Sequence, residues 1–311
     1  MKGDPQMAAD PLTLSKVRPE LSARVPVVPS QKLLLLGGLL LLTALAVWKP
    51  WETAKAFVLL STVFYLVFTL YKFALVRFSV TNRSEIHVAA EEAASLREAD
   101  LPVYSILVPM YHEPESIKTV VESLKRMDYP ANKKDVQLLL EEDDDATRSA
   151  AARIEMPPGF RVTVVPPSFP RTKPKACNIG LEQATGEYLV VYDAEDRPEP
   201  DQLRKAVAAF RRVESDVICL QCRLNFYNPY QNLLTRWFAA EYSAWFDLSL
   251  PGLCALGAVI PLGGTSNHFV MSKLRELMGW DAYNVTEDCD LGIRIYRQGY
   301  KSRMLNTTTW E

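Results

Sequence analysis

The chain has 311 residues, enough for one large domain or two small ones. Its formal net charge is −2 and 48% of its residues are hydrophobic, so its composition gives no reason to expect a nucleic-acid partner. Three histidines and five cysteines show no metal-ligand pattern, which argues against a site built on them. Cys219 and Cys222 have C-x-x-C spacing, but the surrounding run alternates like a strand, so buried packing is favoured over a zinc or redox role.

The first part of the chain, residues 1–31, holds five prolines and scattered charges without a sustained period, which predicts a mostly disordered tail. Two apolar runs follow, at 33–48 and 56–71. A bilayer core needs roughly 20 apolar residues, and about 17 are tolerated, so these runs with their flanks predict a two-helix transmembrane hairpin within 32–76. A helical hairpin buried in a soluble core is the alternative, but neither run has the polar stripe usual in such a helix.

Basic residues flank the two apolar runs on both sides. Lys16, Arg18, Arg24 and Lys32 precede them, and Lys72, Arg77 and Arg83 follow them. The short connection carries only Lys49 and Lys55. The positive-inside rule therefore predicts a multi-pass protein of the cell membrane whose tail and C-terminal region are both cytoplasmic.

After a linker over 77–101, short apolar runs alternate with segments of helical period. Strands are predicted at 104–109, 136–140, 160–165, 187–192 and 216–224, and helices at 115–127, 147–154, 175–184 and 202–213. This alternation predicts an α/β domain over 102–311, with a mostly parallel sheet flanked by helices. The aromatic segment 227–246 interrupts it and predicts an amphipathic helix, either packed on the domain or lying in the membrane interface.

Four short acidic clusters lie on this predicted scaffold, at 111–113, 142–144, 193–196 and 286–288. The first three follow predicted strands, and ligands of open α/β sheets bind beyond the carboxyl ends of strands. Asp193 and Glu195 are two positions apart in an extended segment, so both side chains point the same way. Both could face one Mg²⁺ or Mn²⁺, which would also hold diphosphate oxygens. Asp196 points elsewhere and is expected to cap the turn at Arg197 and Pro198.

Two further segments are candidates for chemistry. The segment 171–178 is basic, and a cation such as Lys173 would stabilise a departing nucleoside diphosphate, although lysines on a surface loop are the simpler interpretation. Asp288 lies in the first turn of a predicted helix, where it could be a general base or, with Thr286, belong to an ordinary helix cap. The turn 263–268 either contacts a sugar or is an ordinary turn.

Together these motifs resemble the membrane-bound family-two glycosyltransferases, which include cellulose, chitin, hyaluronan and mannan synthases. The resemblance covers 102–311 and implies a GT-A-type nucleotide-diphospho-sugar transferase domain. The resemblance implies nucleotide contacts for Pro109, Tyr111, Glu113, Glu142 and Asp143, and a donor-binding basic motif that contains Lys173 and Asn178. It also implies that Asp193 contacts both the donor and the metal ion, and that Glu195 contacts the metal ion. The catalytic base implied by the resemblance is Asp288. Glu142 and Asp143 stand where many relatives carry Asp-Asp. The Gln-x-x-Arg-Trp motif of processive members and C-terminal membrane helices are absent, so the sequence is expected to be an N-terminal fragment of a longer synthase.

The expected function is inverting, metal-dependent transfer of a hexose from a UDP- or GDP-sugar to a growing β-glycan at the cytoplasmic face of the membrane, beside membrane lipid. Transfer of a single sugar to a lipid acceptor is the alternative. A non-catalytic nucleotide-binding membrane scaffold is another, but it would not need Asp288. A nucleotidyltransferase would need neither the 286–288 motif nor two membrane helices.

Overall fold

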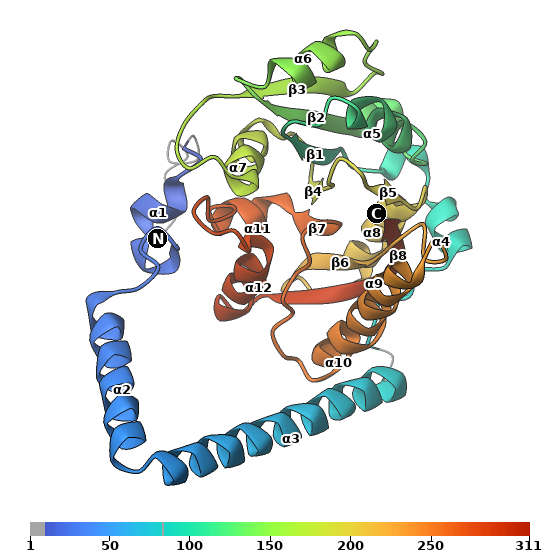
Figure 1. Ribbon diagram of the computed structural model, residues 1–311. Helices are drawn as coiled ribbons and strands as arrows, with labels where there is room; N and C mark the ends of the chain where they lie inside the picture. The colour runs from blue at the N-terminus through green and yellow to red at the C-terminus, as the bar shows by residue number, and fades with distance from the viewer. Residues whose placement is uncertain (1–9, 83) are drawn as a thin grey trace.

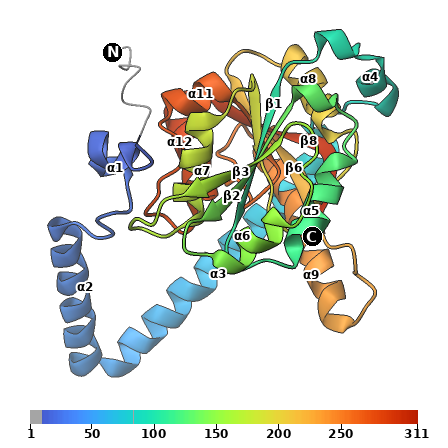
Figure 2. The same cartoon turned by 90° about the horizontal axis from the view of Figure 1, so that it is seen from above.

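The computed structural model describes residues 10–82 and 84–311. Its described strands are β1 (Tyr104–Met110), β2 (Lys134–Glu141), β3 (Phe160–Val165), β4 (Tyr188–Val191), β5 (Arg197–Pro198), β6 (Val217–Asn225), β7 (Asn267–Val270) and β8 (Lys301–Trp310). They form one sheet in the order β3-β2-β1-β4-β7-β6-β8-β5. Helices cover both faces of this sheet, as Figures 1 and 2 show.

The half of the sheet that contains β1 is parallel, as predicted. β1 pairs in parallel with β2 and with β4, and β2 pairs in parallel with β3. β1, β2 and β4 are buried along almost their whole length, which suits strands covered by helices on both faces. β7 lies antiparallel between β4 and β6, and β8 pairs in parallel with β6, so the sheet is mixed. Cys219 and Cys222 are buried in β6 as free cysteines, as predicted.

The described helices of the domain are α5 (Ser116–Lys125), α6 (Asp145–Ala152), α7 (Lys173–Gln183), α8 (Gln202–Arg212), α9 (Leu233–Ser243), α10 (Leu250–Ala255), α11 (Met271–Glu276) and α12 (Glu287–Arg297), with a π-helical turn, η5 (Ala244–Ser249), joining α9 to α10. The four helices predicted between 115 and 213 are confirmed with slightly shifted ends. Buried apolar side chains form one core on each face of the sheet. The domain is therefore a three-layer α/β structure with the carboxyl ends of β1, β2 and β4 at one edge.

The segment before the apolar helices is ordered against the domain. It contains α1 (Thr13–Val17) and η2 (Pro19–Leu21), and Leu14 is buried. Asp281 accepts hydrogen bonds from Ser22 Oγ at 2.9 Å and from Ala23 N at 2.6 Å. The structure thus differs from the predicted disorder over 10–28, because tertiary hydrogen bonds fix a segment that has no period of its own. Residues 1–9 of the predicted tail, and Arg83, lie outside the described residues.

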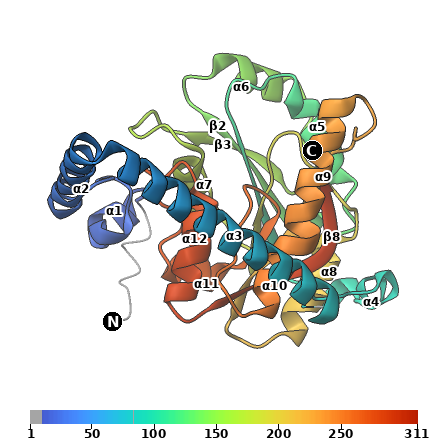
Figure 3. The ribbon, with the colours of Figure 1, turned by 60° about the horizontal axis from the view of Figure 1, so that its bottom comes forward.

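Two long apolar helices follow, α2 (Pro29–Trp48) and α3 (Pro50–Asn82), and both are long and apolar enough to cross a membrane. They are the two helices expected from the sequence, and they diverge from their short connection in Figure 1. The C-terminal half of α3 instead crosses α10 (Figure 3). A Cβ on Gly252 would lie 2.4 Å from the carbonyl oxygen of Leu75, so glycine permits this close crossing.

The segment between α3 and β1 is packed on the domain rather than free. It contains α4 (Ala90–Ser95) and η3 (Glu98–Asp100). Ile86 pairs with Leu305 as an isolated bridge, and Val88 and Ala93 are buried. The described part of this connection, 84–103, is therefore structured and packs on the α/β domain.

Candidate active site

A cavity of about 360 Å³ opens at the carboxyl ends of β1, β2 and β4. It is lined by Pro109, Met110, Tyr111, Glu113, Glu141, Arg171, Thr172, Lys173, Ala176, Asp193, Ala194 and Glu195. Six residues predicted from the sequence to hold donor or metal are in this lining: Pro109, Tyr111, Glu113, Lys173, Asp193 and Glu195. Parallel strand ends bring together motifs that are more than 80 positions apart in the chain.

The segment after β1 is held by the carboxylate of Asp144. Its Oδ2 accepts from His112 N at 2.6 Å, and its Oδ1 accepts from Thr147 N at 3.1 Å, which caps α6. His112 has a φ of 58°, so the backbone turns sharply there. Burial opposes ionisation of Asp144, but the hydrogen bonds from Thr147 and His112 lower its pKa overall. Asp144 therefore positions the loop that carries Tyr111 and Glu113.

Glu113 brings an unpartnered carboxylate oxygen into the cavity lining. Its backbone N–H donates to Thr147 Oγ1 at 3.0 Å, while its buried Oε2 has no hydrogen-bond partner. Burial, and then the negative charges of Glu195 and Asp193, raise the pKa of Glu113 to about 7. A buried acceptor without a partner is costly, so this oxygen is suited to a donor group on a bound molecule.

Asp193 and Glu195 lie in a tight turn after β4. Buried Asp196 accepts from Asp193 N at 2.7 Å and from Thr265 Oγ1, so it fixes this turn and does not face the cavity. Lys173, at the start of α7, donates to Asp193 Oδ1 and to the carbonyl oxygen of Gly264. Although burial opposes it, the charges of Asp193 and Asp288 raise the pKa of Lys173, which keeps the ammonium charged. The turn 263–268 thereby contributes a contact to the site.

The donor set suits a hard divalent cation that shares its ligands with a substrate. Within 10–82 and 84–311, no three His, Cys, Asp or Glu side chains are grouped to hold a metal ion by themselves. Mg²⁺ in particular is usually bound by one or two carboxylates together with substrate phosphates. Asp193 and Glu195 supply two carboxylates beside the cavity. Glu113 lies close enough to both that their negative charges help to raise its pKa. These residues fit an ion whose remaining ligands come from a diphosphate.

Asp288 is buried at the start of α12. Trp280 Nε1 donates to its Oδ1 at 3.3 Å. Burial raises the pKa of Asp288 to about 7, with Lys173 opposing the rise and Glu287 and Asp193 adding to it. Thr286, at the N-cap position, makes no side-chain cap hydrogen bond, since its hydroxyl donates to Asn284 Oδ1. The hydrogen bond that would define Thr286 as a helix cap is therefore not made. A role as general base is supported by the pKa of Asp288, which burial raises to about 7.

Three predicted contact residues lie outside the cavity lining. Asn178 bonds Trp280 twice, donating to its carbonyl oxygen at 2.8 Å and accepting from its N–H at 2.9 Å. Asn178 thus positions the turn that carries Trp280, and through it Asp288. Asp143 forms an ion pair with Arg171, which does line the cavity. Glu142 is exposed, and its backbone accepts from Arg148 at 2.8 Å and donates to the carbonyl oxygen of Val165 at 2.9 Å.

Sequence reasoning missed Glu311. Burial, followed by the charges of Asp193 and Glu195, raises the pKa of Glu311 to about 7. The pairing of Arg197 with Trp310 across β5 and β8 brings Glu311 beside the 193–196 turn. The available signal was an acidic residue directly after Trp310, which follows a run of β-branched residues at 307–309, so Glu311 ends a strand-like run as the other strand-end clusters do.

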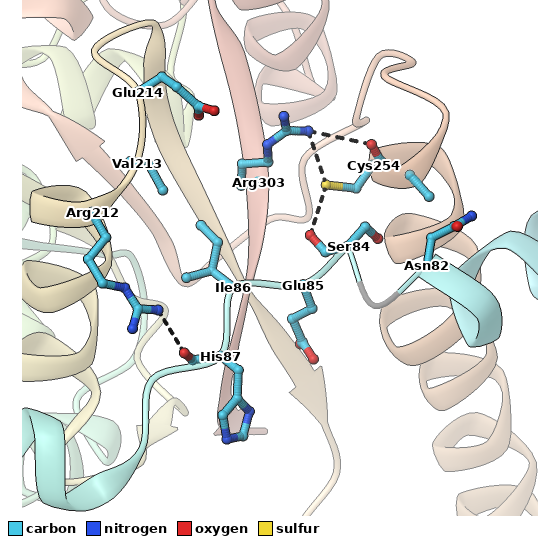
Figure 4. A pocket seen from close by; sticks show the side chains of 11 residues that line it. Asn82, Ser84, Glu85, Ile86, His87, Arg212, Val213, Glu214, Cys254 and Arg303 are labelled. Atoms are coloured by element: carbon cyan, nitrogen blue, oxygen red, sulfur yellow. Dashed lines mark hydrogen bonds between the residues drawn. The ribbon is translucent and has the colours of Figure 1, made fainter.

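A second cavity, of about 660 Å³, lies between the α3–α4 connection, the end of α8, α10 and β8 (Figure 4). Its arginines are engaged within the protein, since Arg212 donates to the carbonyl oxygen of His87 at 2.7 Å and Arg303 to that of Cys254 at 3.4 Å. None of the four acidic clusters lines it. The candidate active site is therefore the smaller cavity at the strand ends.

Known proteins are similar to this chain in sequence. The family model described as "Glycosyltransferase like family 2" matches residues 102–310. "Probable glycosyltransferase YdaM" of Bacillus subtilis (strain 168) is 25% identical, over 68% of this chain and 51% of its own length. Glucomannan 4-beta-mannosyltransferase 1 of Oryza sativa subsp. japonica is 26% identical, over 68% of this chain and 42% of its own length. The chain thus spans about half the length, or less, of these curated relatives.

A solved structure has the same fold. The mannosyltransferase PcManGT from Pyrobaculum calidifontis, in complex with GDP-Man and Mn²⁺, superposes with a TM-score of 0.53. Its sequence is 22% identical, and the match covers 78% of this chain and 66% of that one. At this identity the likeness concerns the fold, which is the GT-A-like, mostly parallel sheet expected from the sequence.

Proposed function

Because the chain belongs to the glycosyltransferase like family 2, we propose that it transfers a hexose from a nucleotide-diphosphate sugar to a growing β-glycan, with inversion and with a divalent metal ion. Its activity as a glycosyltransferase follows from the family. The donor, acceptor, stereochemistry and metal are parts of the proposal.

The proposal is carried by one spatial relationship. Lys173 donates a hydrogen bond to Asp193, and the negative charge of Asp288 helps to raise the pKa of Lys173. Asp193 lines the cavity and would hold Mg²⁺ or Mn²⁺ with Glu195, while buried Asp288 is an acid–base group near neutral pH. A bound ion would neutralise charge on the diphosphate as it leaves. Asp288 would take the proton of the acceptor hydroxyl in a single in-line displacement, which inverts the anomeric carbon.

The remaining lining residues would contact different parts of the nucleotide-sugar donor. Tyr111 is exposed at the rim, where a base could stack on its ring, and Glu113 offers its unpartnered oxygen to a hydroxyl. Arg171, paired with Asp143, would face the nucleotide from the other side. The names of the glucomannan mannosyltransferase relatives make GDP-mannose the first donor to test, with UDP-glucose as the comparison.

Membrane attachment belongs to the same proposal. α2 and α3 are candidate spans, and α3 is docked on the domain through α10. Together with the basic flanks of the two runs, this supports a catalytic domain at the cytoplasmic face. A growing β-glycan is the proposed acceptor, and a lipid is the second candidate because the domain would stand beside the bilayer.

The test uses the full chain in nanodiscs, with Mn²⁺ and either donor. We expect release of nucleoside diphosphate that requires metal, and a β-linked product identified by NMR. Asp193→Asn should abolish metal-dependent donor binding in calorimetric titration, whereas Glu142→Gln, an exposed carboxylate outside the cavity, should retain it. Unchanged metal-dependent binding by Asp193→Asn would remove that residue from the site. Donor binding without turnover by the wild type would favour a scaffold that uses nucleotide as a signal.

A further inference from the structure

Helix α9 carries apolar side chains on the face that points away from the domain. We call Leu233, Leu234, Trp237 and Phe238 of α9, together with Trp245 of the following η5, the α9 stripe, and they are respectively 65%, 60%, 67%, 45% and 41% exposed. Their spacing of three, four, seven and eight positions places them on one side of a helix. No residue of α9 is buried among the part of the chain that the structure describes. Large contiguous apolar patches on a protein surface usually mark an interaction site.

The orientation of α9 is fixed by contacts made by Tyr242 and Ser243 near its C-terminal end. The ring of Tyr242 packs on Phe226 with centroids 4.5 Å apart and on Phe246 at 5.7 Å. Asn225, at the end of β6, donates to Ser243 Oγ at 2.9 Å. Because these contacts hold one side of the helix on the domain, Leu233, Leu234 and Trp237 point outward, while Phe238, at the edge of the stripe, also reaches the Phe226 ring with centroids 6.2 Å apart.

The α9 stripe continues directly into the contact with α3. η5 and α10 follow α9 without a break, and Ser79 Oγ of α3 donates to the carbonyl oxygen of Asp247 at 3.3 Å. The apolar run of α3 ends near Lys72, seven residues or about 10 Å of helix before Ser79. Figure 3 shows α9 running across the direction of α3. If α3 crosses a bilayer, α9 therefore lies along the level at which α3 leaves it.

We propose that the α9 stripe lies on the membrane surface, with a lipid bilayer as its occupant. This rests on the membrane attachment described under the proposed function. Trp237 and Trp245 are the residue type that collects at membrane interfaces. Glu241 falls within the same face, so the helix lies at headgroup level and not in the hydrocarbon.

The consequence is a second attachment of the catalytic domain. Without the α9 stripe, the contacts of α3 with η5 and α10 would hold this side of the domain to the span. A helix lying on the bilayer at the edge of the domain adds the second attachment. It fixes which face of the domain, and so which side of the cavity, is turned toward the membrane.

The experiment measures where the α9 stripe lies in the full chain, reconstituted in vesicles of phosphatidylcholine and phosphatidylglycerol. Nitroxide labels are placed singly by Leu234→Cys, Trp237→Cys, Arg236→Cys, Ser149→Cys and Phe64→Cys. The background is Cys289→Ser, because the other four cysteines are buried. Arg236 is two positions from Leu234 and faces away from it. Ser149 on α6 is a water-exposed control far from α3 (Figure 1). Phe64 reports the span itself.

We expect the labels at 234 and 237 to be more accessible to oxygen than to a water-soluble nickel complex, and those at 236 and 149 to show the reverse. Labels at 234 and 237 that match Ser149, while Phe64 is in lipid, would overturn this proposal alone. A Phe64 label in water would overturn both this proposal and the membrane attachment. Spin–spin broadening at 237 would identify a second copy of the chain as the occupant and would overturn it too. Two labelled positions on the stripe keep the test decisive if one variant fails to fold.

Discussion

The indole N–H of Trp280 points at Oδ1 of Asp288, 3.3 Å away, inside the buried start of α12. Asn178 holds Trp280 by two backbone hydrogen bonds, and Gly279 permits the turn between them. Gly279 has a φ of +65°, and a Cβ there would lie 2.3 Å from Asn178 Oδ1. The candidate base is thus positioned by these hydrogen bonds rather than by a helix cap. Its orientation depends on residues about 100 positions away in the chain.

Replacing the base should separate catalysis from stability. We expect Asp288→Asn to lower turnover by roughly 10²–10⁴-fold, the usual contribution of a positioned acid–base group. Donor binding should survive, because Asp193, Glu195 and Glu113 remain in the cavity. Single-turnover kinetics and calorimetry on the same sample measure both. Glu287→Gln is the matched control, since Glu287 is the adjacent carboxylate. A capping role predicts instead near-normal turnover with about 1 kcal/mol less stability.

The pH dependence of turnover should report Asp288. A general base must be ionised, and burial raises the pKa of Asp288 to about 7, so kcat at saturating donor should fall as the pH drops below about 7. The hydrogen bond from Trp280 lowers this pKa. Trp280→Phe removes the N–H while keeping a ring against Phe269. The pKa of Asp288 should then rise, so the fall of kcat on the acid side of the profile, its acid limb, should move to higher pH. If Phe269→Leu moves the limb equally, packing and not the hydrogen bond sets the pKa.

The strand-end motifs could be predicted because their physical signal is local. Runs such as 188–192 are apolar on both faces, which identifies parallel central strands, and the chain direction then places Asp193 and Tyr111 at one edge. β7 has only four residues and no period, so its antiparallel pairing with β4 could not be predicted from the sequence. Glu311 shows a strand-end pattern in the sequence, but its place beside Asp193 depends on the pairing of β5 with β8, which the sequence does not show.

Long-range hydrogen bonds explain the other differences. Asn178 is separated from Trp280 by 102 positions, and Ser22 from Asp281 by 259. Side chains of this kind look alike in the sequence whether they bind a donor or another part of the chain. The divergence of α2 and α3 could not be predicted from the sequence either. Both helices are apolar all round, so no stripe of side chains specifies which face packs on a partner.

The crossing of α3 over α10 should be sensitive to one methyl group. Gly252→Ala places a Cβ 2.4 Å from the backbone oxygen of Leu75, so the helices must separate. Overpacking of this kind costs about 1–3 kcal/mol, and we expect a lower melting temperature with faster proteolysis near 82–84. Gly37→Ala in α2 is the control, because nothing lies within 4 Å of its Cβ position. Equal melting of both variants would show that α3 is not held at Gly252.

Stability in the absence of metal should fall as the pH rises. The pKa values of Glu113, Asp288 and Glu311 are each raised to about 7, for all three first by burial and then by neighbouring charges that include Asp193. A carboxyl with a raised folded-state pKa favours the folded protein while it holds its proton. That contribution is complete below the unfolded pKa, near 4, and is lost as the pH rises through about 7.

The melting temperature of the metal-free chain should therefore decrease between about pH 5 and about pH 8, because ionisation of these carboxyls in the folded state is opposed by burial and by like charges. Glu311→Gln removes one titrating group and should flatten this decrease, whereas Glu142→Gln, which is exposed and outside the cavity, should not. Mn²⁺ with a nucleoside diphosphate should restore stability at pH 8 in the wild type, since a bound cation offsets the carboxylate charge. A melting temperature that is flat or rising over this range, measured calorimetrically without metal, would show that the three carboxyls are already ionised in the folded protein and that the site holds a compensating charge.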